Sequence, residues 1–258
     1  MKAQVIAIAL SLSCCAAWSA APLPSPIGSP TVAEQYLFSA ANTERVQRGL
    51  RPLRWDMSLF QAAVYHAQEM AERESISHQY DGEPDLSARG EGAGARFSEI
   101  AENVAEAPSA IMIHEAWMNS PHHRANLLDP KVDSIGISVV SRNGQLYAVE
   151  DFDRSVVKLS VEQQESAVQD LLASTASSVK VLPTSDAARR TCAMERGYAG
   201  SRQPWFTVRY TAADLTRLPS MLQEKLASGK YSEAEVGACA AQDTQNFSAY
   251  SIAVMLYR

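Results

Sequence analysis

The residues best suited to chemistry lie in the first half of this sequence, where all five histidines fall within residues 66–123. Imidazole titrates near neutral pH and is the commonest metal-ligating side chain, so each histidine is a candidate acid, base or ligand. The densest group of polar residues is the stretch 102–136, which contains Glu102, Ser120 and His123. This stretch is the first place to look for a functional site.

His78 is the one upstream candidate, and it closes the second predicted helix before a long loop. Alone, it would be an ordinary C-terminal histidine that favours the helix dipole. Glu102 and His123 are expected in other elements of the same domain, so the three side chains can meet only through the fold. Their spacing in the sequence does not by itself bring them together.

The other three histidines have simpler interpretations. His66 lies on the apolar side of the second predicted helix, where a packed histidine with a hydrogen-bonding partner is expected. His114 precedes Trp117 by three residues on one helical face and is expected to be half-buried. His122 follows a proline in a turn and is expected to face solvent.

Composition bounds the class of protein. The chain has 258 residues, of which 46% are hydrophobic, enough for one large or two ordinary domains with a sizeable core. Its formal net charge is -6, and it lacks the clustered Lys and Arg that would neutralise phosphates. We therefore exclude nucleic acid and anionic membrane surfaces as partners.

The first residues are typical of a secretory signal peptide, because Lys2 precedes a short apolar run that ends in small residues. The run is too short for a stable membrane span. Cleavage is predicted after Ser19, which gives a signal peptide over 1–19. The mature protein is then expected to be secreted, or to reside in the periplasm or cell envelope. Lipidation at Cys14 or Cys15 is the alternative, although both match a lipobox poorly.

Signal removal leaves two cysteines, Cys192 and Cys239, in a chain bound for an oxidising compartment. A disulfide between them is the simplest interpretation. Two buried free thiols are the alternative.

The rest of the pattern predicts two domains after a Pro/Ser-rich arm over residues 20–32. The first domain, 33–153, is expected to hold helices over 33–48, 56–74, 97–105 and 108–119 and a hairpin turning at Asn143-Gly144. The second, 158–258, is predicted to be a small α+β domain of unassigned role, with helices over 160–174 and 215–228 and strands over 206–210 and 250–257. No internal sequence repeat is visible between the halves.

Several motifs occur in the order found in one known family. They are Asn42-Thr43-Glu44-Arg45, Gly49-Leu50-Arg51-Pro52-Leu53-Arg54-Trp55-Asp56, His66-Ala67-Gln68-Glu69-Met70-Ala71, His78, Glu102-Asn103, Trp117-Met118-Asn119-Ser120-Pro121-His122-His123-Arg124 and Ile135-Gly136. Together they resemble the CAP superfamily of cysteine-rich secretory, antigen 5 and pathogenesis-related proteins, also called SCP-like extracellular proteins, and its bacterial branch in particular. The resemblance covers residues 33–153.

The resemblance implies an α+β fold, an αβα sandwich whose central cavity presents two histidines and two acidic residues. By motif position the histidines are His78 and His123, and the first acid is Glu102. The position of the second acid holds Ser120 here. A serine cannot act as a carboxylate base, so this departure weakens any mechanism that needs two acids.

Three interpretations of this site stay open. In the first, His78 and His123 bind a divalent metal loosely, most plausibly zinc, with Glu102 holding a water or orienting a ring. In the second, the site is hydrolytic: Glu102 acts as base toward metal-bound water, or Ser120 acts as nucleophile with His123 and Glu102. In the third, the residues form a buried hydrogen-bond network that stabilises the sandwich.

The sequence thus predicts a secreted, non-catalytic protein that binds a small-molecule, lipid or cell-envelope ligand in a cleft formed by His78, Glu102, Ser120 and His123, with or without a divalent metal. A peptidase or cell-envelope hydrolase using the same cleft is the first alternative. A scaffold that recognises a partner through residues 158–258 is the second.

Overall fold

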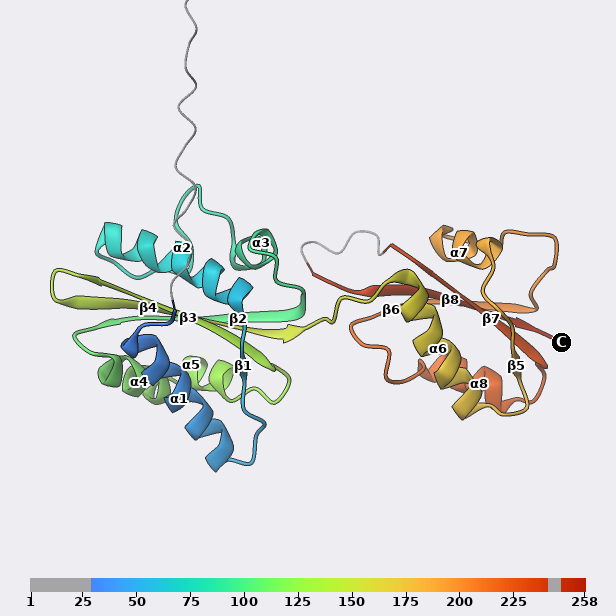
Figure 1. Ribbon diagram of the computed structural model, residues 1–258, viewed down its shortest axis with the longest axis horizontal. Coiled ribbons are helices and arrows are strands. Elements are labelled where there is room, and N and C mark those ends of the chain that lie inside the picture. Colours follow the sequence, from blue (N-terminus) through green and yellow to red (C-terminus); the bar gives the residue numbers. More distant parts are fainter. Residues whose placement is uncertain (1–28, 241–246) are drawn as a thin grey trace, which may run out of the picture.

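The chain forms two successive units, each a four-stranded sheet with helices on both faces (Figure 1). This computed structural model describes residues 29–240 and 247–258, so the predicted signal peptide and most of the predicted arm lie outside it. We call residues 32–155 the N-terminal unit and residues 161–257 the C-terminal unit. Within the described ranges, no helix is both long enough and apolar enough to span a bilayer.

The N-terminal unit contains five helices and four strands within the described residues. They are α1 (Val32–Gln47), β1 (Arg54–Trp55), α2 (Met57–Arg73), α3 (Leu86–Gly92), β2 (Phe97–Ala107), α4 (Ala110–Asn119), α5 (Pro121–Leu127), β3 (Ser134–Arg142) and β4 (Gln145–Ser155). The strand order is β1-β3-β4-β2, with β1 parallel to β3 and the other neighbours antiparallel. Helices α2 and α3 cover one face of the sheet, and α1, α4 and α5 cover the other (Figure 1). The expected αβα sandwich is therefore confirmed.

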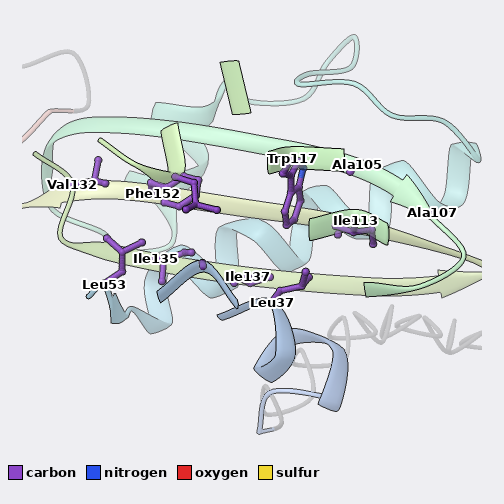
Figure 2. Packing of buried hydrophobic residues seen from close by; sticks show 13 residues of the cluster. Leu37, Leu53, Ala105, Ala107, Ile113, Trp117, Val132, Ile135, Ile137 and Phe152 are labelled. Carbon is purple, nitrogen blue, oxygen red and sulfur yellow. The ribbon is translucent and has the colours of Figure 1, made fainter. Parts of the chain in front are cut away.

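The main core lies between the sheet and the α1 and α4 side. Figure 2 shows Ile113 and Trp117 of α4 packed with strand residues that include Ile135, Ile137 and Phe152, and all five are fully buried. Burying a side chain of this size stabilises the fold by roughly 1.5–3 kcal/mol. This core fixes β2 and the α4–α5 segment, which carry three of the four predicted site residues.

Gly136 allows α2 to lie unusually close to β3. A Cβ atom at this position would stand 2.1 Å from the backbone nitrogen of Phe60 and 2.3 Å from the carbonyl carbon of Leu59. Only glycine leaves room for helix backbone at that distance. The contact sets the height of α2 above the sheet, and with it the position of the loop that carries His78.

One predicted element of this unit is wrong. Residues 97–105 were expected to be helical, but Phe97–Ala107 is strand β2, paired with β4 almost along its whole length. Helix α2 also ends at Arg73, so His78 lies in the loop beyond it. The hairpin turn is confirmed, since Asn143 and Gly144 both have positive φ, 50° and 83°.

The C-terminal unit contains three helices and four strands within its described residues. They are α6 (Val161–Thr175), β5 (Lys180–Val181), α7 (Asp186–Ala193), β6 (Phe206–Ala212), α8 (Ser220–Ala227), β7 (Glu233–Cys239) and β8 (Tyr250–Tyr257). The predicted disulfide is confirmed, joining Cys192 of α7 to Cys239 of β7 with a Cα–Cα distance of 5.8 Å. Helix α7 and strand β7 were not predicted from the sequence.

A few polar contacts join the two units. Arg154 at the end of β4 pairs with Asp214, with 3.1 Å between the guanidinium nitrogen and the carboxylate oxygen. The backbone N–H of Ser248 donates to the carbonyl oxygen of Phe97 over 2.7 Å. The Tyr250 hydroxyl donates to the carbonyl oxygen of Val157, in the segment that connects the units.

Candidate functional site

The four predicted site residues come from three parts of the N-terminal unit. His78 lies in the loop after α2, and Glu102 lies in the middle of β2. Ser120 and His123 both lie in the α4–α5 segment, Ser120 between the helices and His123 in α5. Two of them meet directly. Nδ1 of His78 is 2.8 Å from Oε1 of Glu102, which is the convergence that spacing alone did not establish.

Glu102 is the buried anchor of this group, with only 2% of its side chain exposed. Its first oxygen accepts from His78, and its second accepts from the guanidinium of Arg89 in a buried ion pair. Such charge-assisted bonds are about twice as strong as neutral ones. Both carboxylate oxygens are thus engaged within the protein.

His78 presents its ring at the surface, with 62% of its side chain exposed. The pKa of His78 is raised, chiefly because Glu102 accepts a hydrogen bond from it, and desolvation and the Arg89 charge oppose this shift. Since Nδ1 is occupied by Glu102, Nε2 is the nitrogen left for a ligand. The site therefore offers a ring that is readily protonated and held in a fixed orientation.

His123 differs from His78 in its electrostatics. The pKa of His123 is lowered by partial burial first, and then by the charges of His78 and His122. The Asn103 side-chain amide donates to the backbone carbonyl of His123 over 3.0 Å, so α5 is tied to β2 beside Glu102. Asn126 strengthens this tie by donating to the Glu102 carbonyl oxygen over 3.2 Å. The pKa values of His78 and His123 are thus shifted in opposite directions.

Ser120 is the joint between α4 and α5, and its carbonyl oxygen accepts from the N–H of Arg124 over 2.9 Å. Its hydroxyl does not cap α5, which Pro121 opens. Among the described residues, no hydrogen bond links this hydroxyl to His123 or Glu102. The contacts required of a nucleophile and its base are therefore not formed here.

The donor set can be tested against a resident metal. In the described ranges, no group of three or more His, Cys, Asp or Glu side chains is placed to hold a metal ion. Zinc sites in proteins use at least three such ligands, and both oxygens of Glu102 are already taken. These residues do not fit a tightly held metal, and a loosely bound ion on His78 and His123 stays a prediction.

Comparison with known proteins finds a family match over part of this chain. Residues 38–152 match the family profile described as CAP, the cysteine-rich secretory protein family. This segment is a CAP domain. It contains α2, α3, α4, α5, strands β1, β2 and β3 and most of β4, and so every predicted site residue.

Two Bacillus subtilis proteins are similar to the CAP domain, an uncharacterized membrane protein, YlbC, and an uncharacterized protein, YkwD. Each is 31% identical over 113 residues, which is 42% of this chain. The match covers 32% of YlbC and 42% of YkwD, so this chain spans less than half of either relative.

Two solved structures are also similar. An extracellular SCP-domain protein of Bacillus anthracis is 24% identical with a TM-score of 0.45, covering 50% of this chain and 45% of that one. An outer surface protein of Borrelia burgdorferi is 22% identical, also with a TM-score of 0.45, covering 48% of this chain and 92% of that one.

The CAP domain also holds a buried charge network that the sequence did not predict. Arg89 of α3 contacts Glu102 and lies 3.5 Å from Glu83. His66, expected to be a packed histidine with partners, is fully buried, with Nδ1 2.6 Å from Glu83 and Nε2 2.6 Å from the Ser77 carbonyl oxygen. Both ring nitrogens thus have a hydrogen-bonding partner within the protein. Arg89, His66 and two acidic side chains thus lie together beside the loop that carries His78.

The two remaining histidines lie outside this network. His122 is exposed, as expected. His114 is more buried than predicted, at 9% exposure, and burial lowers its pKa.

Two further acids lie beneath the network on β4. Asp151 is the register partner of Glu102 and Glu150 is the partner of Asn103, and both acids are fully buried. Burial and the Glu102 charge raise the pKa of Asp151 well above its usual range, and burial raises the pKa of Glu150 to about 8. Glu150 is therefore mainly neutral below about pH 8, and burial favours the neutral form of Asp151. A run of acids inside an apolar strand was the signal that could have revealed them.

Proposed function

We propose that this chain is an extracellular CAP-domain protein that binds a polar ligand at the His78 surface, formed by His78, Glu102, Ser120 and His123, without converting it. The observation that carries this proposal is the burial of Glu102, whose side chain is 2% exposed and whose two oxygens accept from His78 and Arg89. A general base needs a lone pair within reach of the proton it removes. Here the carboxylate orients an exposed imidazole instead.

The chemistry of the surface supports a ligand with an acceptor group. His78 offers an exposed ring with a raised pKa, and His123 adds a second imidazole on the neighbouring helix. Carboxylates, phosphates and carbonyl oxygens all accept from such donors. Fragments of cell-envelope polymers and lipid headgroups carry these groups, and the similar SCP-domain protein of Bacillus anthracis is described as extracellular.

We expect replacement of His78 and His123 by Ala to weaken binding by at least about tenfold, which corresponds to the loss of about 1.4 kcal/mol of binding free energy. Peptidoglycan fragments and soluble phospholipid headgroups are the probes, and calorimetric titration gives the affinity. His122→Ala is the matched control, because this exposed histidine is adjacent to His123 but outside the site. Unchanged affinity in the double variant for every probe that the native protein binds would contradict the proposal.

The same material tests the hydrolase alternative. Native protein is incubated with peptide and peptidoglycan libraries, and products are followed by mass spectrometry. Turnover that Glu102→Gln abolishes while the fold is retained would replace the binding proposal with a hydrolytic one. Binding retained by the double histidine variant but lost on disruption of the C-terminal unit would favour the scaffold alternative.

Chelation is expected to leave stability unchanged, because Glu102 is satisfied by His78 and Arg89 with no ion. Melting temperatures of the native protein with and without EDTA provide the measurement. Added zinc is expected to bind weakly, and more strongly at pH 8 than at pH 6, since a proton on His78 competes with the ion. A fall of several degrees in melting temperature on chelation would show a resident metal instead.

A further inference from the structure

The two units share one topology, although no sequence repeat is visible. In each, the sheet order is first, third, fourth, second strand: β1-β3-β4-β2 and β5-β7-β8-β6. In each, the short first strand is parallel to the third, and the other pairs are antiparallel. The second helix covers one face and the remaining major helices cover the other, as Figure 1 shows for α2 and α7.

A glycine occupies the same place in both units. A Cβ on Gly136 would meet the carbonyl carbon of Leu59 and the nitrogen of Phe60, the third and fourth residues of α2. A Cβ on Gly237 would stand 2.3 Å from the carbonyl carbon of Ala188 and 2.7 Å from the nitrogen of Arg189, the third and fourth residues of α7. The third strand therefore meets the same turn of the same helix in each unit.

The first helices also use one device. Helices α1 and α6 both open with a capping box, formed by Thr31 with Glu34 and by Ser160 with Gln163. The Glu34 carboxylate of α1 accepts from the backbone N–H of Val139 in β3 over 2.9 Å. In the C-terminal unit, Glu165 of α6 accepts from the N–H of Ala238 in β7 over 3.1 Å.

We infer that the C-terminal unit is a second, diverged copy of the N-terminal αβα unit, in which the position of Glu102 is held by Arg209. The strand register gives this equivalence. Glu102 pairs with Asp151, which pairs with Gly136, whereas Arg209 pairs with Ala253, which pairs with Gly237. The inference extends the CAP fold to a part of the chain that the family profile does not match.

Arg209 performs the structural task of Glu102 with the opposite charge. Glu102 holds the loop after α2 through His78. Arg209 holds the end of α7 and the segment after it, donating from Nε to the carbonyl oxygen of Thr191 in α7 over 2.9 Å and from Nη2 to that of Gly197 over 2.5 Å. No histidine occurs after His123. The second copy thus keeps the contact between strand and loop but lacks the imidazoles, so the chain has one His78 surface.

The disulfide supplies a sharp test of this equivalence. Cys192 is the seventh residue of α7, and Cys239 lies two residues after Gly237. The equivalent residues of the N-terminal unit are Ala63, the seventh of α2, and Ser138, two after Gly136; both are buried. Cysteines form a disulfide only where Cα atoms lie roughly 4.4–6.8 Å apart with suitable orientation. We expect Ala63→Cys with Ser138→Cys to form a second disulfide in the full chain.

Mass spectrometry of an unreduced digest identifies the cross-linked peptides. The matched control is Ala62→Cys with Ser138→Cys, because the preceding helix residue points about 100° away. A folded Ala63/Ser138 double variant in which both new thiols alkylate without reduction would overturn the inference, as would equal cross-linking in the control.

If the double-cysteine variant does not fold, hydrogen exchange measured on Arg209→Met tests the inference instead. Amides of residues 197–200 are expected to exchange at least tenfold faster, since they lose their contact with β6, whereas Arg190→Met, at an exposed arginine of α7, leaves them unchanged. Unchanged exchange in Arg209→Met would overturn the inference.

Discussion

Glu150→Gln is expected to remove a large part of the pH dependence of stability of the CAP domain. Full burial raises the pKa of Glu150 from 4.5 to about 8, so between these values the folded protein binds a proton that the unfolded chain releases. The contribution of Glu150 to stability is therefore complete below about pH 4.5 and is lost as the pH rises through 8. Between pH 5 and pH 8, the free energy of unfolding of the native protein should fall by about 3 kcal/mol more than that of the variant.

Urea unfolding at pH 5 and pH 8 measures this difference. Glu115→Gln, at an exposed carboxylate of α4, is the control and should follow the native protein. Asp153, whose pKa burial raises to about 7, and Asp151, whose pKa burial also raises, act in the same direction and remain in both proteins. The prediction fails if native protein and Glu150→Gln lose the same free energy between the two pH values.

The fold of the CAP domain could be predicted because its motifs resemble those of a family with a known fold. At β2, by contrast, local residue propensity led to the wrong prediction of a helix. The segment from Phe97 to Ala107 is rich in Ala and Glu, which favour helix. Pairing with β4 and burial of Val104 and Ala105 outweigh that preference. Tertiary contacts decided the structure of this strand, and a single sequence does not display them.

Some contacts of the candidate site could likewise be predicted from the sequence, and others could not. The contact between His78 and Glu102 was anticipated from the motif positions. Arg89 and Asp151 were not, because they belong to α3 and β4 and meet Glu102 only through chain folding. A buried arginine has no distinctive spacing, so sequence patterns could not separate it from a surface one.

The C-terminal unit shows a further limit. Helix α6 and strand β8 matched their predicted bounds to within a residue, because a capping box and an apolar run mark them. Helix α7 and strand β7 were missed, and with them the shared topology of the two units. The equivalence of the two units rests on glycine contacts, backbone register and an exchange of Glu102 for Arg209. None of these produces detectable sequence similarity.

Arg89→Met is expected to be the most destabilising single change in the charge network, costing on the order of 3–5 kcal/mol. The Arg89 side chain is 2% exposed, and it donates to Glu102 and to the carbonyl oxygens of His78 and Pro84. Its loss leaves the buried Glu102 carboxylate without its principal cation. Urea unfolding at pH 7 gives the loss. Arg73→Met, at an exposed arginine of α2 that pairs with Glu69, should lose much less, because an exposed ion pair contributes little to stability.

The source of that loss can be isolated with a double variant. If the cost of Arg89→Met arises from an uncompensated charge, Glu102→Gln in the same chain should restore at least about 1–2 kcal/mol, because it removes the stranded carboxylate. Purely additive losses would instead mean that Arg89 acts through packing and its bonds to the loop carbonyls. Regained stability in the double variant, with ligand binding at the His78 surface still impaired, would separate the two roles of Glu102. These roles are to neutralise the charge of Arg89 in the interior and to orient His78 at the surface.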